Sequence, residues 1–287
     1  MRLKLISLPW SAVIHPKDMR VGHCVCWRTA WWNWRQWTWI TSATSQWRGA
    51  QKNAIKPWQV KTWCIPQPSA RFVAKMEDVL SVYQRPYDPK RPQVCLDEIS
   101  KTLHSTPRGE IPMQSGQPKR EDYEYQRHGT CALFLAIEPL AGFRRVWVRS
   151  RRTKLDCAEV LRDLVDVVYP DADRIVLVVD NLNIHHPACL YERFDPAEAR
   201  RIAAKIEWHY TPEHGSWLNV AECELSVLKR QCLKRRLPTL EVVEREANIW
   251  QEQRNQAQVG VDWRFTTDDA RIKLKRLYPI VKEQISA

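Results

Sequence analysis

Apolar and polar positions along the chain predict a series of strands and helices that begins near residue 93. Short runs rich in β-branched and apolar residues predict strands at 94–96, 130–137, 145–149, 174–179 and 206–210. Helical patterns are found at 154–169, 196–205, 219–235 and 240–256, and another begins at Ser69. The run at 174–179 contains almost only Ile, Val and Leu after its first residue, which indicates a central strand buried on both faces.

The order of these elements predicts the fold class. The first three strands are close enough in sequence to form a meander, whereas the later strands alternate with helices as in βαβ crossovers. The chain is therefore expected to form an α/β fold, with a mixed sheet flanked by helices over residues 93–280.

The segments outside this region differ in composition. Residues 1–48 hold eight of the fifteen tryptophans, several of them next to arginines, a pattern that can stack on nucleic-acid bases. The alternative is that 1–48 is not a natural folded domain, for instance a frame-shifted or mis-started stretch, and we expect an atypical extension there. Residues 49–92 are predicted to be a linker with one helix, and residues 281–287 a tail.

Charge and cysteine usage narrow the class of protein. A net charge of +12 favours a polyanionic partner such as nucleic acid, although a solvated basic surface is the alternative. Nine cysteines without a C-x-x-C pair indicate reduced thiols rather than a disulfide framework or zinc site. No run reaches the ~18 apolar residues that a membrane span needs, so we expect a cytoplasmic protein with no membrane partner.

Three acids occur where functional groups of α/β proteins gather. Asp97 and Asp180 follow predicted strands, and Glu222 lies near a helix start that Asn219 could cap. Carboxylate oxygens suit Mg²⁺ or Mn²⁺, and two such ions can promote in-line displacement at phosphorus. In a basic chain, this predicts metal-dependent chemistry on nucleic-acid phosphates.

Each acid also has an ordinary structural interpretation. Asp97 could face solvent, Asp180 could open an Asx turn, and Glu222 could complement the helix dipole. Glu98 and Glu224 are competitors for the metal-binding role. Glu98 should point to the opposite face from Asp97 if the strand continues, and Glu224 lies about 200° around the helix from Glu222.

Residues 178–185 and 210–222 resemble the DDE transposases of bacterial insertion sequences, in the mariner superfamily. Further matching motifs follow in the family's order at 63–66, 87–89, 96–98, 123–125, 138–142, 151–154 and 263–267. The resemblance implies an RNase H-like fold, two Mg²⁺ (or Mn²⁺) ions, strand cleavage at insertion-sequence ends and strand transfer. Carried over by position, Asp97, Asp180 and Glu222 would be the catalytic and metal-binding acids.

The resemblance also implies partners: the terminal inverted repeats of the element, a target DNA and a second copy of the chain. Residues 1–48 do not resemble the family's helix-turn-helix region, and Ile99-Ser100 replaces the usual Lys-Pro. The alternative function is therefore an inactive DNA-binding transposase remnant. A third interpretation is a metal nuclease for repair or RNA processing.

Supporting residues are expected around the acids. Asn181, His185 and Asn219 could hold the acids by hydrogen bonds, and His185 could instead contact phosphate or a metal-bound water. Two basic clusters, at 144–154 and 229–236, are expected to position DNA through its phosphates, with solvated surface as the alternative. The expected phosphate contacts are Arg151, Arg152, Lys154, Lys229 and Arg230.

Overall fold

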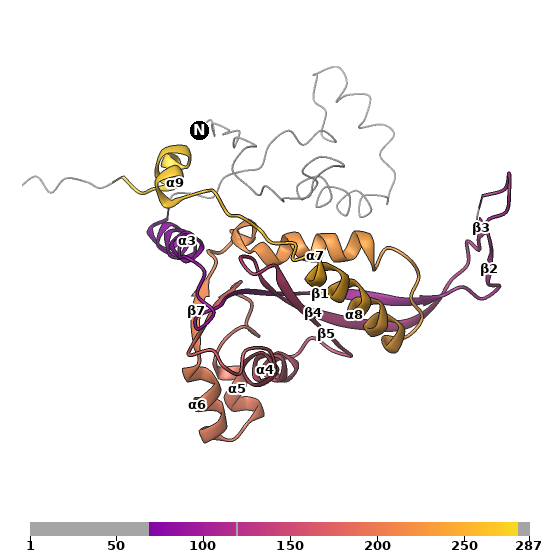
Figure 1. The fold of residues 1–287 in the computed structure, drawn as a ribbon, viewed down its shortest axis with the longest axis horizontal. Helices are drawn as coiled ribbons and strands as arrows, with labels where there is room; N and C mark the ends of the chain where they lie inside the picture. Colours follow the sequence, from indigo (N-terminus) through magenta and orange to yellow (C-terminus); the bar gives the residue numbers. More distant parts are fainter. Residues whose placement is uncertain (1–68, 119, 281–287) are drawn as a thin grey trace, which may run out of the picture.

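The computed structural model describes residues 69–118 and 120–280, which are built around one five-stranded mixed sheet (Figure 1). Its strands are β1 (Gln93–Ser105), β4 (Gln126–Glu138), β5 (Phe143–Arg149), β6 (Ile175–Val179) and β7 (Ile206–Tyr210). They lie in the order β5-β4-β1-β6-β7, with antiparallel pairing from β5 to β1 and parallel pairing from β1 to β7. The predicted meander and crossovers are confirmed, together with the mixed sheet flanked by helices.

Helices cover both faces of the sheet and enclose two cores. One core includes residues of α3 (Ala70–Tyr83), α7 (Val220–Gln231) and α8 (Leu240–Gln256). The other core includes residues of α4 (Lys154–Asp163), α5 (Ala188–Arg193) and α6 (Pro196–Ala204). Because side chains alternate along a strand, Cys95 enters the first core and Leu96 the second. All five residues of β6 are buried, which confirms the predicted central strand.

The observed bounds correct several predictions. β1 continues to Ser105 rather than ending at residue 96, because its antiparallel ladder with β4 extends beyond the apolar run. The predicted helix at 154–169 is α4 followed by a π-helical turn at Leu164–Val168, and α7 ends at Gln231 instead of residue 235. The elements that were not predicted include α5, α9 (Thr267–Lys273), β2 (Glu110–Ile111) and β3 (Arg120–Glu121).

Some predictions concern parts of the chain outside the described residues. These are the Trp-rich stretch 1–48, most of the linker before Ser69, and the tail 281–287. Among the described helices, none is long and apolar enough to cross a membrane. The thiols of Cys95, Cys131, Cys157, Cys189 and Cys232 are buried and free, as the cysteine pattern predicts.

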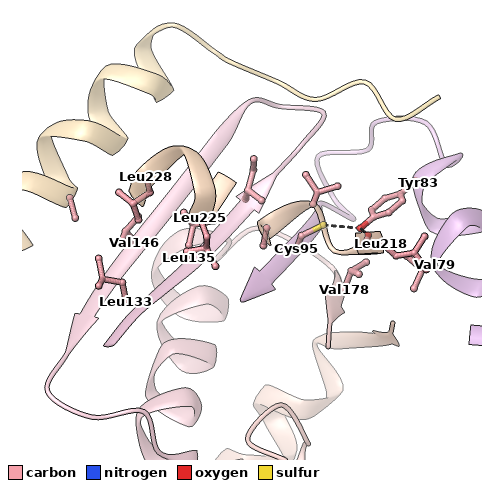
Figure 2. Packing of buried hydrophobic residues seen from close by; sticks show 14 of the residues in the cluster. Val79, Tyr83, Cys95, Leu133, Leu135, Val146, Val178, Leu218, Leu225 and Leu228 are labelled. Atoms are coloured by element: carbon pink, nitrogen blue, oxygen red, sulfur yellow. Dashed lines mark hydrogen bonds between the residues drawn. The ribbon is translucent and has the colours of Figure 1, made fainter. Parts of the chain in front are cut away.

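Tyr83 connects three elements near the start of β1 (Figure 2). Its hydroxyl group donates a hydrogen bond to the carbonyl oxygen of Leu218 at 2.7 Å and lies 3.4 Å from the Cys95 sulfur. Leu218 ends a short 3-10 turn (Ser216–Leu218) that leads into α7, and Cys95 lies two residues before Asp97. Tyr83 therefore ties α3 to both β1 and the start of α7.

Replacement of Tyr83 by phenylalanine is expected to destabilise the protein by about 1–3 kcal/mol, because the buried Leu218 carbonyl loses the hydrogen bond from the Tyr83 hydroxyl group. Chemical denaturation would measure the change. Tyr87→Phe is the matched control, since Tyr87 is 55% exposed. Equal stability of Tyr83→Phe and Tyr87→Phe would contradict this role.

Candidate active site

Two of the three predicted acids lie on adjacent parallel strands. The pairing of β1 with β6 sets Cys95 opposite Val178, and Asp97 and Asp180 each lie two residues beyond that pair. Asp180 directly follows the last residue of β6, while β1 continues through Asp97. The two carboxylates are therefore presented at the same level, where the parallel pairing of these strands ends.

The third acid, Glu222, occupies the first turn of α7, and Asn219 positions that turn. The side-chain oxygen of Asn219 accepts a hydrogen bond from the Ala221 N–H at 3.1 Å, and its amide group donates to the Leu96 carbonyl at 3.1 Å. Asn219 is fully buried, so both bonds are protected from water. The helix start is thus attached to β1 at the residue before Asp97. Asn219 acts through the backbone rather than by bonding an acid.

The charges of the three acids influence one another: Asp180 and Glu222 act on Asp97, and Asp180 acts on Glu222. Burial raises the pKa of Asp97 to about 7, with further contributions from Glu98, Asp180 and Glu222. The side chain of Glu222 reaches solvent, yet partial loss of hydration and the charge of Asp180 raise its pKa as well. Burial opposes ionisation of Asp180, but hydrogen bonds from His185 and the Leu182 N–H outweigh it and lower its pKa.

The chemistry of these donors fits a divalent cation. Carboxylates that are desolvated and mutually repulsive gain most from a nearby positive charge. Within residues 69–118 and 120–280, however, no three His, Cys, Asp or Glu side chains are already arranged around one ion position. Mg²⁺ commonly binds through one or two carboxylates and completes its shell with water and phosphate oxygens. Binding by pairs of these acids together with substrate is therefore the arrangement that fits.

His185 is buried between two acids. Its Nδ1 lies 2.6 Å from Asp180 Oδ1, and its Nε2 lies 2.9 Å from Glu98 Oε2. These acids outweigh the effect of burial and raise the pKa of His185 to about 9. Nδ1 is bonded to Asp180 and Nε2 faces the Glu98 carboxylate, although that contact lacks hydrogen-bond geometry. The ring is inaccessible, so His185 does not face a phosphate or a metal-bound water.

Asn181 does not contact any of the acids. Its amide nitrogen donates to the Thr211 carbonyl, and its side-chain oxygen accepts from the ammonium group of Lys75. It therefore joins the loop after β6 to the loop after β7 and to α3. Lys75 and Tyr210 also line a cavity of about 430 Å³ beside this loop. No sequence pattern pointed to Lys75, because it reaches the site from a helix more than 100 residues away in the chain.

Glu224, the alternative to Glu222 as a metal ligand, has a structural role. Its carboxylate is buried and contacts Arg144 at 3.0 Å and Arg254 at 2.6 Å, which links α7 to β5 and α8. Arg144 is also fully buried, so it does not belong to a basic surface as the sequence suggested. The pattern misled because Arg144 and Arg145 are adjacent in a strand, where neighbouring side chains point to opposite faces.

The five residues predicted to contact phosphate differ in their surroundings. Arg151 and Lys229 are exposed, and Arg230 bonds the Ser226 carbonyl within its own helix. Arg152 lies 3.5 Å from Glu98, and Lys154 lies 2.7 Å from Glu192. Arg151 and Lys229 are therefore the members best placed to meet a polyanion.

A family model described as "DDE superfamily endonuclease" matches residues 92–244, which is more than half of the chain and includes all three acids. The chain belongs to this family. A search of solved structures found similarity to the crystal structure of the Mos1 strand transfer complex, with 14% identity and a TM-score of 0.48. That alignment covers 91% of this chain and 80% of the other. No curated protein matches the chain.

The raised pKa of Asp97 predicts a pH-dependent effect of Asp97→Asn on stability without metal. The unfolded chain loses this proton near pH 4, but the folded protein keeps it until about pH 7. From about pH 4 to 7, ionisation of Asp97 therefore favours the unfolded state and lowers the free energy of unfolding. We expect Asp97→Asn to be more stable than wild type in chelator, with a difference that grows over this range and then levels off. Thermal unfolding across pH would measure it, and a pH-independent difference would contradict the assignment.

Proposed function

We propose that this DDE superfamily endonuclease is the catalytic core of an insertion-sequence transposase, which cleaves DNA strands and transfers them. Asp97, Asp180 and Glu222 would bind the catalytic ions, Mg²⁺ or Mn²⁺ and two in number. The observation that carries the proposal is the pairing of two acids at equal positions on adjacent parallel strands, with a capped helix presenting a third. Carboxylates that lie near one another are otherwise costly, because they repel one another.

Divalent ions bound at such a site would supply charge to stabilise the attacking and leaving oxygens of a phosphodiester. The protein groups have separate tasks. Hydrogen bonds from His185 and the Leu182 N–H keep Asp180 oriented and ionised. Asn219 keeps the helix start, and with it Glu222, against β1. Cleavage would leave a 3′-hydroxyl group, and attack of that oxygen on a second DNA phosphodiester would form a new bond and release another 3′-hydroxyl.

We further propose terminal inverted repeats and target DNA as the partners, bound by a homodimer in the cytoplasm. The net charge of +12 supports a polyanionic partner. Arg151 is exposed in the segment before α4 and precedes Arg152, which lies 3.5 Å from Glu98; Lys229 lies about two turns beyond Glu222 on α7. Contacts from these side chains to phosphates would position DNA without reading its sequence.

Plasmid nicking tests the enzymatic proposal. Wild-type protein is expected to nick supercoiled DNA in Mg²⁺ or Mn²⁺, and Asp97→Asn or Asp180→Asn should reduce the rate by about 100-fold or more, since ion-supplied charge is worth several kcal/mol. Asp171→Asn is the control, because Asp171 is an exposed acid before β6. Products joined to a second DNA would distinguish a transposase from a simple nuclease.

Nicking that persists in Asp180→Asn would refute the assignment of the acids. Salt-dependent DNA binding without cleavage in either metal, including on DNA that carries the element's own ends, would favour the inactive remnant instead.

DNA binding should depend steeply on salt, because it releases counterions from phosphates. Arg151→Ala and Lys229→Ala are each expected to lower the slope of log affinity against log salt by about one. Fluorescence anisotropy with a labelled duplex would measure the slopes. Arg174→Ala is the control, since this exposed arginine precedes β6 at the end opposite Asp180. An unchanged slope in both site variants would place the DNA elsewhere.

A further inference from the structure

Glu98 is a buried carboxylate that the three-acid assignment does not use. Its side chain is only 2% exposed. Burial of an ionised carboxylate is costly unless it is paired, so its partners indicate why it is present. Those partners are His185 at 2.9 Å and Arg152 at 3.5 Å, and the latter approaches the other carboxylate oxygen.

The alternation of β1 explains how two adjacent acids serve different faces. Asp97 follows Cys95 on the side of the sheet that packs against α7, whose first turn contains Glu222. Glu98 follows Leu96 on the side that packs against α4 and α5. His185 lies just before α5 and spans the distance from Glu98 to Asp180. The side chains of the adjacent residues Asp97 and Glu98 therefore reach the site from opposite faces of the sheet.

We propose that Glu98 is a positioning residue of the active site, which holds the His185 ring so that the ring fixes the Asp180 carboxylate for metal binding. The inference rests on the proposed metal-binding role of the three acids. It differs from the sequence-based view of Glu98, which treated it as a rival metal ligand to Asp97.

The physical reason lies in the two nitrogens of the ring. Without Glu98, the buried Nε2 would have no charged neighbour, and the ring could turn or admit water. The Glu98 carboxylate, 2.9 Å from Nε2, attracts the ring electrostatically and so favours this orientation, although the contact lacks hydrogen-bond geometry. The same logic applies to the carboxylates that orient histidine ligands in metal sites, where loss of the outer partner weakens metal binding by about 10–100-fold.

The test measures Mn²⁺ binding to the full chain. The electron paramagnetic resonance signal of free Mn²⁺ reports how much of the ion remains unbound. Glu98→Gln keeps the length but removes the charge, and Glu98→Asp keeps the charge but shortens the reach to His185. Each is expected to weaken Mn²⁺ binding by about 10–100-fold. Loss in Glu98→Asp is informative, because a simple effect of net charge would leave that variant unchanged.

The control is Glu138→Gln. Glu138 is buried on the same sheet, at 5% exposure, and accepts a hydrogen bond from Tyr169 away from this chain of contacts. It should bind Mn²⁺ like wild type. The double variant Glu98→Gln/His185→Gln should bind no more weakly than His185→Gln alone, because Glu98 acts through His185. Unfolding temperatures in chelator identify any variant that does not fold, and Glu98→Asp then carries the test.

Wild-type binding in both Glu98 variants, or effects of Glu98 and His185 that multiply, would overturn the positioning role while leaving the proposed function intact. Absence of Mn²⁺ binding by the folded wild-type protein would instead refute the metal site itself, and the role of Glu98 with it.

Discussion

Parallel pairing between β1 and β6 is the constraint on which the site depends. Only three residue pairs form this ladder, from Gln93 opposite Val176 to Cys95 opposite Val178. Because side chains alternate along a strand, a slip of one residue would move Asp97 to the other face of the sheet. The two cores oppose such a slip, since Cys95 and Leu96 would exchange environments. The position of one carboxylate thus depends on the burial of its apolar neighbours.

The attachment of α7 to β1 is the second requirement, and two buried polar side chains provide it. Asn219 bonds the Leu96 carbonyl, and Tyr83 bonds the Leu218 carbonyl. One bond is donated by the N-cap residue of α7 and the other is accepted by the residue before it, so together they restrict where Glu222 can lie. Apolar packing of α7 alone would set its distance from the sheet, but it is non-directional and would specify the helix end less sharply.

Local patterns predicted much of this architecture. The strand 174–179, the strand 206–210 and the helix 240–256 depend mainly on their own apolar periodicity, and each was found close to its predicted bounds. The strand end before Asp180 and the helix start before Glu222 were also predicted from neighbouring residues in the sequence. Features set by distant contacts were missed: the full length of β1 depends on its pairing with β4, and the burial of Arg144 depends on Glu224 and Arg254. The contact of Glu98 with His185 joins residues 87 positions apart and leaves no signature in a single sequence.

The buried charges around Glu224 have a consequence for the rotation of α7 about its own axis. Arg144 and Arg254 both form ion pairs with Glu224. Rotation of the helix about its axis would therefore leave a buried guanidinium group without its counter-ion. Two residues along a helix correspond to about 200° of rotation. With Glu224 held inward, Glu222 is directed away from that side, toward the edge where the other acids lie. The buried charges around Glu224 therefore limit the rotation of α7 and fix the direction of Glu222.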